Sequence, residues 1–166
     1  MPILPIIKYP NPILKTPCEP LRHELPGINQ LIIDMQETLL NYPFCVGLAA
    51  PQVGTLLRIV VIDCSRSRKP CKHHGNLVLI NPVITHREGE FIMREGCLSL
   101  PDYTGNVKRA SSVIVEGLDN EEIPQKIVAE GFEAVVLQHE IDHLEGILFL
   151  DRITSLKTDV FRRKSY

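Results

Sequence analysis

The sequence lacks several features that would assign it to a specialised class of protein. It contains no tryptophan, and no apolar stretch reaches the ~18 residues that a membrane-spanning helix requires. Positive and negative residues are interspersed, the formal net charge is −2 and no long basic stripe occurs, so we expect neither a membrane segment nor a nucleic-acid surface. Residues 1–14, MPILPIIKYPNPIL, have no basic segment before an apolar one, so we expect no signal peptide.

The cysteines do not form the pattern of a disulfide framework. There are five of them, an odd number, and no CxxC pair occurs. This favours reduced thiols, which together with the expected lack of a signal peptide predicts a cytoplasmic protein.

The remaining composition is typical of a globular protein with a proper core. The chain has 166 residues, of which 44% are hydrophobic and 23% charged. No repeat, low-complexity segment or linker-like stretch divides it, so we predict a single domain over residues 1–166.

Periodicity predicts a helix at each end of a series of strands. Apolar residues at helical spacing predict a first helix over residues 28–40 and a second over about 131–145, with Gly146 as its C-terminal stop. The β-type runs between them lie at residues 58–63, 76–84, 90–95, 111–118 and 127–129. The order of helix, strands and helix predicts an α+β fold rather than repeated βαβ units.

The second predicted helix contains LQHEIDHLEG, residues 137–146, which has the HExxH arrangement of helical metal sites. The apolar stripe of Phe132 and Val135 continues onto His139 and His143, so both imidazoles are expected to point inward. A lone buried histidine is usually a hydrogen-bonded core residue. Two of them at i and i+4 beside Glu140 favour a metal, because one ion satisfies both rings.

A third ligand is expected upstream, because only 23 residues follow His143. Cys97 in EGCLSLP, residues 95–101, is the candidate, although a free cysteine is more often a small buried hydrophobe. A thiolate and two imidazoles leave one coordination position open, which is typical of catalytic sites. Glu140 lies about 100° around the helix from His139, where it can act as general base on a water whose pKa the metal lowers to ~7.

Gln52 lies in CVGLAAPQVG, residues 45–54, and can donate an amide N–H to a developing oxyanion. Taken alone, this small-residue segment is more typical of a tight loop in the core.

Three segments resemble, in order, the signature motifs of the peptide deformylase family: CVGLAAPQ, EGCLSLP and QHEIDHLEG. They are separated by 42 and 36 residues. The resemblance extends to IIKYPNPIL near the beginning, to PDYTGNVKR after the cysteine motif and to ILFLDRI after the helix, so it covers essentially the whole chain. It implies an α+β fold with mostly antiparallel sheets packed around the central helix that carries HExxH.

The resemblance also implies an activity. Members of the family remove the formyl group from the N-terminal formylmethionine of nascent polypeptides and release formate. They usually use ferrous iron, Fe(II), and also accept nickel, cobalt or zinc. The implied partners are therefore one divalent metal ion and N-formylmethionyl nascent peptides, in the cytoplasm of a bacterium in preference to an organelle.

The site residues of the family carry over position by position. The implied metal ligands are Cys97, His139 and His143. Glu140 is the implied acid and base, and Gln52 with the backbone N–H of Leu98 would stabilise the oxyanion of the tetrahedral intermediate. Residues implied to contact the substrate are Val46 and Gly47 along its groove and Met93, Phe132, Val135 and Val136 around the methionine side chain. The last four also fit a purely structural core.

Metal ligands normally need hydrogen-bonded support, for which Glu95, Arg109 and Asp142 are the candidates. We predict that at least one of the two carboxylates pairs with Arg109.

The chain departs from the family pattern at three places. Cys45 stands where the family commonly has glycine, and Thr104 where some relatives carry an arginine near the substrate. The chain ends in FRRKSY, whereas some relatives have a basic C-terminal helix linked to ribosome docking, so we predict at most a transient ribosome contact.

Two other functions and a second metal site compete with this interpretation. A general HExxH metallopeptidase would need a downstream ligand, for which Glu145, Asp151 and Asp159 are poorly placed. A non-catalytic protein stabilised by its metal would have no open coordination position. The segment CSRSRKPCKHHG, residues 64–75, contains four thiol or imidazole groups, but its irregular spacing favours an exposed loop.

Overall fold

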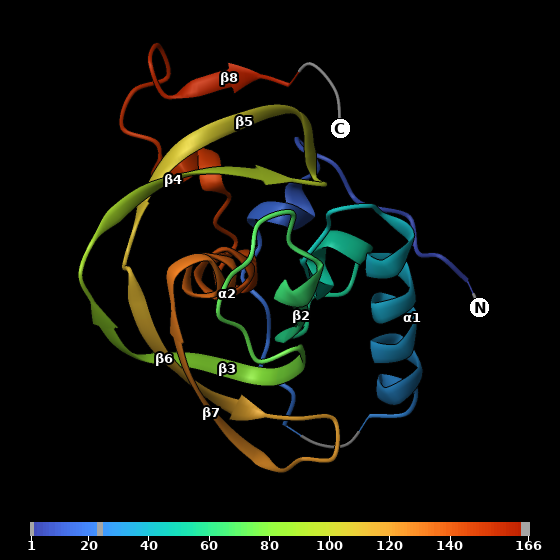
Figure 1. The fold of residues 1–166 in the computed structure, drawn as a ribbon. Coiled ribbons are helices and arrows are strands. Elements are labelled where there is room, and N and C mark those ends of the chain that lie inside the picture. Colours follow the sequence, from blue (N-terminus) through green and yellow to red (C-terminus); the bar gives the residue numbers. More distant parts are fainter. Residues whose placement is uncertain (1, 23–24, 164–166) are drawn as a thin grey trace.

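A buried helix, α2 (Gly131–Leu144), lies at the centre of the molecule between two antiparallel sheets (Figure 1). The computed structural model describes residues 2–22 and 25–163. Every residue of α2 from Glu133 to Leu144 is buried. The sequence predicted one buried stripe on this helix. Instead all of its faces are covered, because sheets enclose it from both sides.

The larger sheet has five strands in the order β1-β2-β3-β6-β7, and every neighbouring pair is antiparallel. Its strands are β1 (Gly47–Ala49), β2 (Ile59–Asp63), β3 (Asn76–Glu88), β6 (Ser112–Leu118) and β7 (Pro124–Glu130). In β2, Val60 and Ile62 pack into the core around α2, whereas Ile59 and Val61 pack against α1 (Ile28–Asn41) on the opposite face. Because both faces are covered, this strand is a continuous apolar run rather than an alternating one.

The smaller sheet has three strands in the order β4-β5-β8. They are β4 (Phe91–Cys97), β5 (Leu100–Arg109) and β8 (Val160–Arg162). Side chains alternate along β4, so that Glu95 and Cys97 are buried while Arg94 and Gly96 are exposed. This alternation brings a carboxylate and a thiol to the side of the sheet that faces α2.

The structure confirms both predicted helices and the α+β class, but it differs from the prediction in several strands. β3 runs to Glu88 rather than residue 84, because its polar second half pairs with β6. β1, β5 and β8 were not predicted. β5 contains Pro101 and Gly105 and lacks a clear alternation, and it is held by pairing with β4 on one side and β8 on the other. Short 3-10 turns connect these elements: η1 (Pro12–Lys15), η2 (Ala50–Val53), η3 (Cys64–Arg66) and η4 (Phe149–Arg152).

The described part of the chain contains no helix that is long and apolar enough to span a membrane.

The C-terminal end of α2 is closed by Gly146, as the sequence predicted. Gly146 has a φ of +74°, and its N–H donates to the carbonyl of His143 at 3.2 Å. A Cβ atom at this position would lie 2.7 Å from the backbone of Lys15. The turn after α2 therefore requires glycine for both its backbone conformation and its packing.

Gly146→Ala is expected to lower the free energy of unfolding by about 3 kcal/mol. About 1 kcal/mol of this arises from the left-handed backbone, and the rest from displacement of the Lys15 backbone. Gly75→Ala is the matched control, because Gly75 also has a positive φ of +70° but has no atom within 4 Å of its Cβ position. It should cost only ~1 kcal/mol. Urea denaturation followed by circular dichroism measures both, and equal losses would contradict a packing role for Gly146.

Candidate metal centre

Three potential metal ligands converge between α2 and the end of β4. His139 and His143 lie one turn apart on α2, and Cys97 is the last residue of β4. The sulfur and one nitrogen of each ring all lie within 4.8 Å of one another, and all three residues are buried. The Sγ of Cys97 is 3.4 Å from the Nε2 of His143. Thiolate and imidazole at this spacing suit a single zinc or iron ion.

Each histidine is set up differently for binding a cation. The Nδ1 of His139 contacts the Oε1 of Glu95 at 2.8 Å, which leaves its Nε2 for a metal. Burial alone would lower the pKa of His139, but the carboxylate of Glu140 and the thiol of Cys97 raise it well above its ordinary value. Burial lowers the pKa of His143 well below its ordinary value, so this ring is neutral and offers a lone pair. The surroundings of His139 therefore favour positive charge, and the neighbouring His143 is a neutral donor.

Glu140 lies beside the three donors without belonging to them. It is buried, and among the described residues its Oε1 has no hydrogen-bond partner. A Cβ atom on Gly47 would lie 2.6 Å from the Oε2 of Glu140, so the glycine provides the space that this carboxylate occupies. Burial raises the pKa of Glu140 to about 7. A carboxyl group with this pKa can accept a proton and return it near neutral pH.

Gln52 is held with its amide nitrogen pointing at the thiol. Its side-chain oxygen accepts a hydrogen bond from the N–H of Ala49 at 3.0 Å, and its Nε2 lies 3.4 Å from the Sγ of Cys97 and 3.2 Å from the Oγ of Ser99. Leu98, the residue after Cys97, lines the same cavity. Ser99 was not predicted as a site residue, although it lies within the EGCLSLP segment that carries Cys97; it is completely buried.

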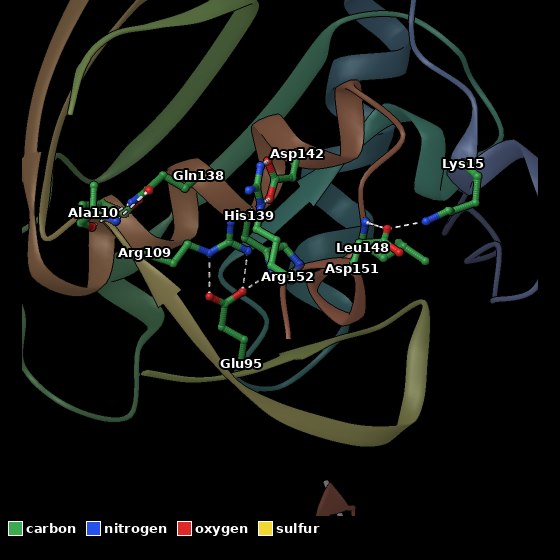
Figure 2. A network of polar contacts seen from close by, with 11 residues as sticks. Lys15, Glu95, Arg109, Ala110, Gln138, His139, Asp142, Leu148, Asp151 and Arg152 are labelled. Atoms are coloured by element: carbon green, nitrogen blue, oxygen red, sulfur yellow. Dashed lines mark hydrogen bonds and ion pairs between the residues drawn. The ribbon is translucent and has the colours of Figure 1, made fainter. Parts of the chain in front are cut away.

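A buried ion-pair network lies behind His139 (Figure 2). Arg109 donates two hydrogen bonds to Glu95, at 2.7 and 2.8 Å, and a third to Asp142 at 2.6 Å. The predicted pairing of Arg109 with a carboxylate is thus confirmed for both candidates. Burial alone would raise the pKa of Glu95, but the hydrogen bonds from Arg109 and His139 outweigh it and lower the pKa to about 2. Arg152, which the sequence analysis missed, also binds Asp142, at 2.5 and 2.8 Å.

Two adjoining cavities lie beside the potential ligands, and Cys97 and His139 line the first of them. The first has a volume of about 280 Å³, and its lining includes Val46, Gly47, Phe132, Val135 and Val136 together with Gln52, Leu98, Cys97, His139 and Glu140. The second, of about 980 Å³, is lined by Met93 and shares Val46 and Phe132 with the first. All six residues expected to contact substrate therefore lie on these two surfaces.

Cys45 and Thr104, two positions that depart from the family pattern, differ in whether they line the first cavity. Cys45 lines the first cavity, and burial raises the pKa of its thiol to about 12. The positive φ in this segment falls on Phe44, at 67°, and not on Cys45. Thr104 pairs with Gly96 in the smaller sheet and does not line the first cavity.

The loop between β2 and β3 does not bring its thiols and imidazoles together. Residues 65–75 are exposed or partly exposed, as predicted, but Cys64 is buried in the core because the apolar face around α2 extends beneath η3. The ring and the N–H of His74 both contact Glu133 of α2. Within residues 2–22 and 25–163, the cluster around Cys97 is the one group of three or more potential ligands.

These features define the class of protein. An α+β fold with a buried cysteine and two histidines converging beside a carboxylate is the arrangement of a metal-dependent hydrolase.

Comparisons with known proteins specify the family. Residues 3–159 match the family model of polypeptide deformylase. A peptide deformylase of Thermodesulfovibrio yellowstonii is 47% identical over 164 residues, which cover 99% of this chain and 97% of that protein. The chain belongs to the polypeptide deformylase family, whose members are metal-dependent.

Solved structures agree with this assignment. The crystal structure of a peptide deformylase from Legionella pneumophila superposes with a TM-score of 0.85 at 39% identity, covering 94% of this chain and 89% of that one. A peptide deformylase from Synechococcus elongatus in complex with actinonin gives a TM-score of 0.84 at 35% identity, covering 95% and 82%. The fold and the enzyme type are thus those predicted from the sequence.

Arg109→Met is expected to lower the free energy of unfolding by about 3–5 kcal/mol, because it leaves the buried carboxylate of Glu95 without its main partner. Arg87→Met is the matched control, since Arg87 is exposed on β3, and it should change stability by less than about 0.5 kcal/mol. Urea titration of both variants measures the difference. Similar losses would show that the buried network contributes no more than a surface arginine.

The same network predicts how stability depends on acid. The pKa of Glu95 is lowered in the folded protein, so its contribution is fully present above its ordinary pKa of 4.5 and is lost as the pH falls from there to about 2. Arg109→Met should therefore show a shallower loss of stability than the parent between these pH values. Urea midpoints measured at several pH values test this, and parallel curves would be inconsistent with it.

Proposed function

We propose that this chain removes the formyl group from the N-terminal formylmethionine of nascent polypeptides and releases formate, with Cys97, His139, His143 and Glu140 as the centre of the site. The observation that carries the proposal is the convergence of the three donors within 4.8 Å beside a buried carboxylate. The adjoining cavity is small, at about 280 Å³, which suits a small formyl group better than an internal peptide bond.

The donor set fits the metal that the family uses. Cys97, His139 and His143 would hold the ion, and Glu95 supports His139 from behind. When bound, the ion supplies Lewis acidity and makes water a better nucleophile near neutral pH. A thiolate with two imidazoles suits iron and zinc alike, so we infer ferrous iron as the native metal from family membership, with nickel, cobalt or zinc able to replace it.

Glu140 is the group that moves the proton. In the first step its carboxylate takes a proton from the attacking water, as a new bond forms between the water oxygen and the formyl carbon. In the second step the carboxylic acid returns that proton to the methionine nitrogen as the carbon–nitrogen bond breaks. The products are formate and a free amino terminus, and Glu140 is regenerated.

Gln52 and Leu98 stabilise the negative charge that develops on the formyl oxygen. The amide of Gln52 is oriented by the N–H of Ala49, so its Nε2 hydrogens face the region of the thiol without further rearrangement. The backbone N–H of Leu98 is the second donor. Two donors placed in advance lower the barrier, because no reorganisation is needed as the charge forms.

The substrate would lie along Val46 and Gly47, with its methionine side chain against the apolar lining. The residues proposed for that contact are Met93, Phe132, Val135 and Val136. Two of them, Val135 and Val136, are also buried in the helix, so they serve the core at the same time.

The setting of the enzyme is inferred more broadly. We infer that residues 1–166 form one catalytic domain that works in the cytoplasm of a bacterium, in line with the bacterial source of relatives such as that of T. yellowstonii. A transient ribosome contact stays a prediction. β8 (Val160–Arg162) pairs with β5 as an edge strand, and Arg163 lines the first cavity. The basic residues Arg162 and Arg163 therefore do not belong to a free helix.

Glu140→Gln is expected to lower the rate of formate release from a formyl-methionyl peptide by about 10²-fold or more, because no group then accepts the proton of water. The protein should be purified without air and loaded with ferrous iron. Its metal content should equal that of the parent, because Glu140 does not bind the ion. Glu145→Gln is the matched control, since Glu145 lies just beyond the same helix, is half exposed and pairs with Arg58, and it should keep full activity.

Further outcomes distinguish the competing functions. Cleavage of internal peptide bonds would favour a general metallopeptidase. If iron, nickel or cobalt stabilises the fold but no formate is released with any of them, a non-catalytic protein is favoured and the proposal is overturned.

A further inference from the structure

Two arginines stand where the two cavities meet. Arg68 belongs to the loop that follows η3, and Arg94 lies on the exposed face of β4. Both line the first cavity, which is also lined by Cys97 and His139, and both also line the second, larger cavity. A peptide that leaves the first cavity through the second therefore passes both arginines.

Neither arginine is neutralised by a carboxylate. The guanidinium of Arg68 lies over the ring of Phe44, 3.7 Å from its centroid, and that of Arg94 lies over Phe161 at 3.6 Å. Among the described residues, no carboxylate is paired with either. Stacking on an aromatic face orients a guanidinium while its N–H groups stay available at the edge.

The acidic residues nearby are already engaged or lie deep. In the second cavity Glu130 pairs with Lys72 at 2.5 Å, while Lys69 adds a further positive charge. In the first cavity Glu95 is held by Arg109, and Glu140 is buried at the metal centre. The junction is therefore positive, although the chain as a whole has a net charge of −2.

The loop that carries Arg68 is fixed to the segment before β1. Arg66 donates hydrogen bonds to the carbonyls of Leu39, Cys45 and Tyr42, at 3.0, 3.1 and 3.2 Å. Phe44, within this segment, is 54% exposed and has a φ of 67°, a conformation that bulky residues rarely adopt. Such strain in an exposed aromatic residue at a cavity mouth is typical of a functional position.

We propose that Arg68 and Arg94 make this enzyme prefer formyl-methionyl peptides that carry aspartate or glutamate among their second to fourth residues. The inference rests on the proposed function, because it requires the formyl group to lie at the metal centre. An extended peptide then advances ~3.3 Å per residue, so the residues after methionine cross the junction. A carboxylate on one of them would pair with a guanidinium that has no acidic partner. The same carboxylate on a free peptide in water lacks this ion pair, so the pair favours binding.

The test compares formyl-Met-Ala-Ala-Ala amide with derivatives that carry glutamate at position two, three or four, each beside the matching glutamine peptide. The amide end removes the terminal carboxylate as a competing anion. We expect kcat/KM to be about two- to fivefold higher for glutamate than for glutamine at one or more positions, which is the upper part of the range for pairs of partly exposed charges. The difference should appear in KM and should shrink in ~1 M salt, because salt screens exposed charges.

Variants assign the preference to the two arginines. The double variant Arg68→Gln with Arg94→Gln should bring the glutamate to glutamine ratio close to one. Arg68→Glu should invert the preference, in favour of peptides with lysine in place of glutamate. Arg87→Gln is the matched control, because it removes the same charge from an exposed site on β3 outside both cavities, and it should keep the ratio of the parent.

Three negative outcomes of this experiment can be distinguished. Equal kcat/KM values for all glutamate and glutamine peptides would overturn this inference alone, and the basic junction would then better suit a polyanion such as RNA. A parent enzyme that releases formate from none of the peptides would overturn the proposed function and this inference with it. If the double variant still prefers the glutamate peptides, the role assigned to Arg68 and Arg94 is overturned, while the proposed function stands.

Discussion

The burial of Arg109 between Glu95 and Asp142 is the interaction on which the site depends. It connects the hairpin of β4 and β5 to α2, which lies further along the chain. An unpaired charge inside a protein costs several kcal/mol, so each of the three residues fixes the position of the other two. Glu95 in turn orients His139, and Cys97 follows two residues later on the same face of β4. The positions of the potential ligands Cys97 and His139 therefore depend on the charge pairing behind them.

The central helix unites the core and the chemistry in one element. Its polar residues mostly have partners: Glu133 contacts His74, and Gln138 binds the backbone of Ala110. Among the described residues of this helix, the buried polar atoms without a hydrogen-bond partner are the Oε1 of Glu140 and the Nδ1 of His143. The Oε1 of Glu140 lies where water and substrate would meet, whereas the Nδ1 of His143 is the ring nitrogen opposite the Nε2 that contacts Cys97.

The fold was predictable where local periodicity is strong. The α2 pattern, the apolar run of β2 and Gly146 each reflect a local rule of helix spacing, strand burial or positive φ. β5 and β8 were not predictable from the sequence. Neither has a clear alternating pattern of its own, and pairing with neighbouring strands holds their backbones. The full burial of α2 was likewise hidden, because a helix with one apolar stripe and a helix enclosed on all sides differ only in what packs against them.

The sequence by itself determined the chemistry of the site: two histidines one turn apart, a glutamate between them and a cysteine in an ordered upstream motif. These follow from spacing within single elements and from the resemblance of three segments to one family. Only the tertiary structure decided which groups support them. Arg152 on Asp142, Ser99 beside Gln52 and Arg68 over Phe44 depend on contacts between separate elements. Such contacts leave no periodic trace, because they arise from how the sheets close around the helix.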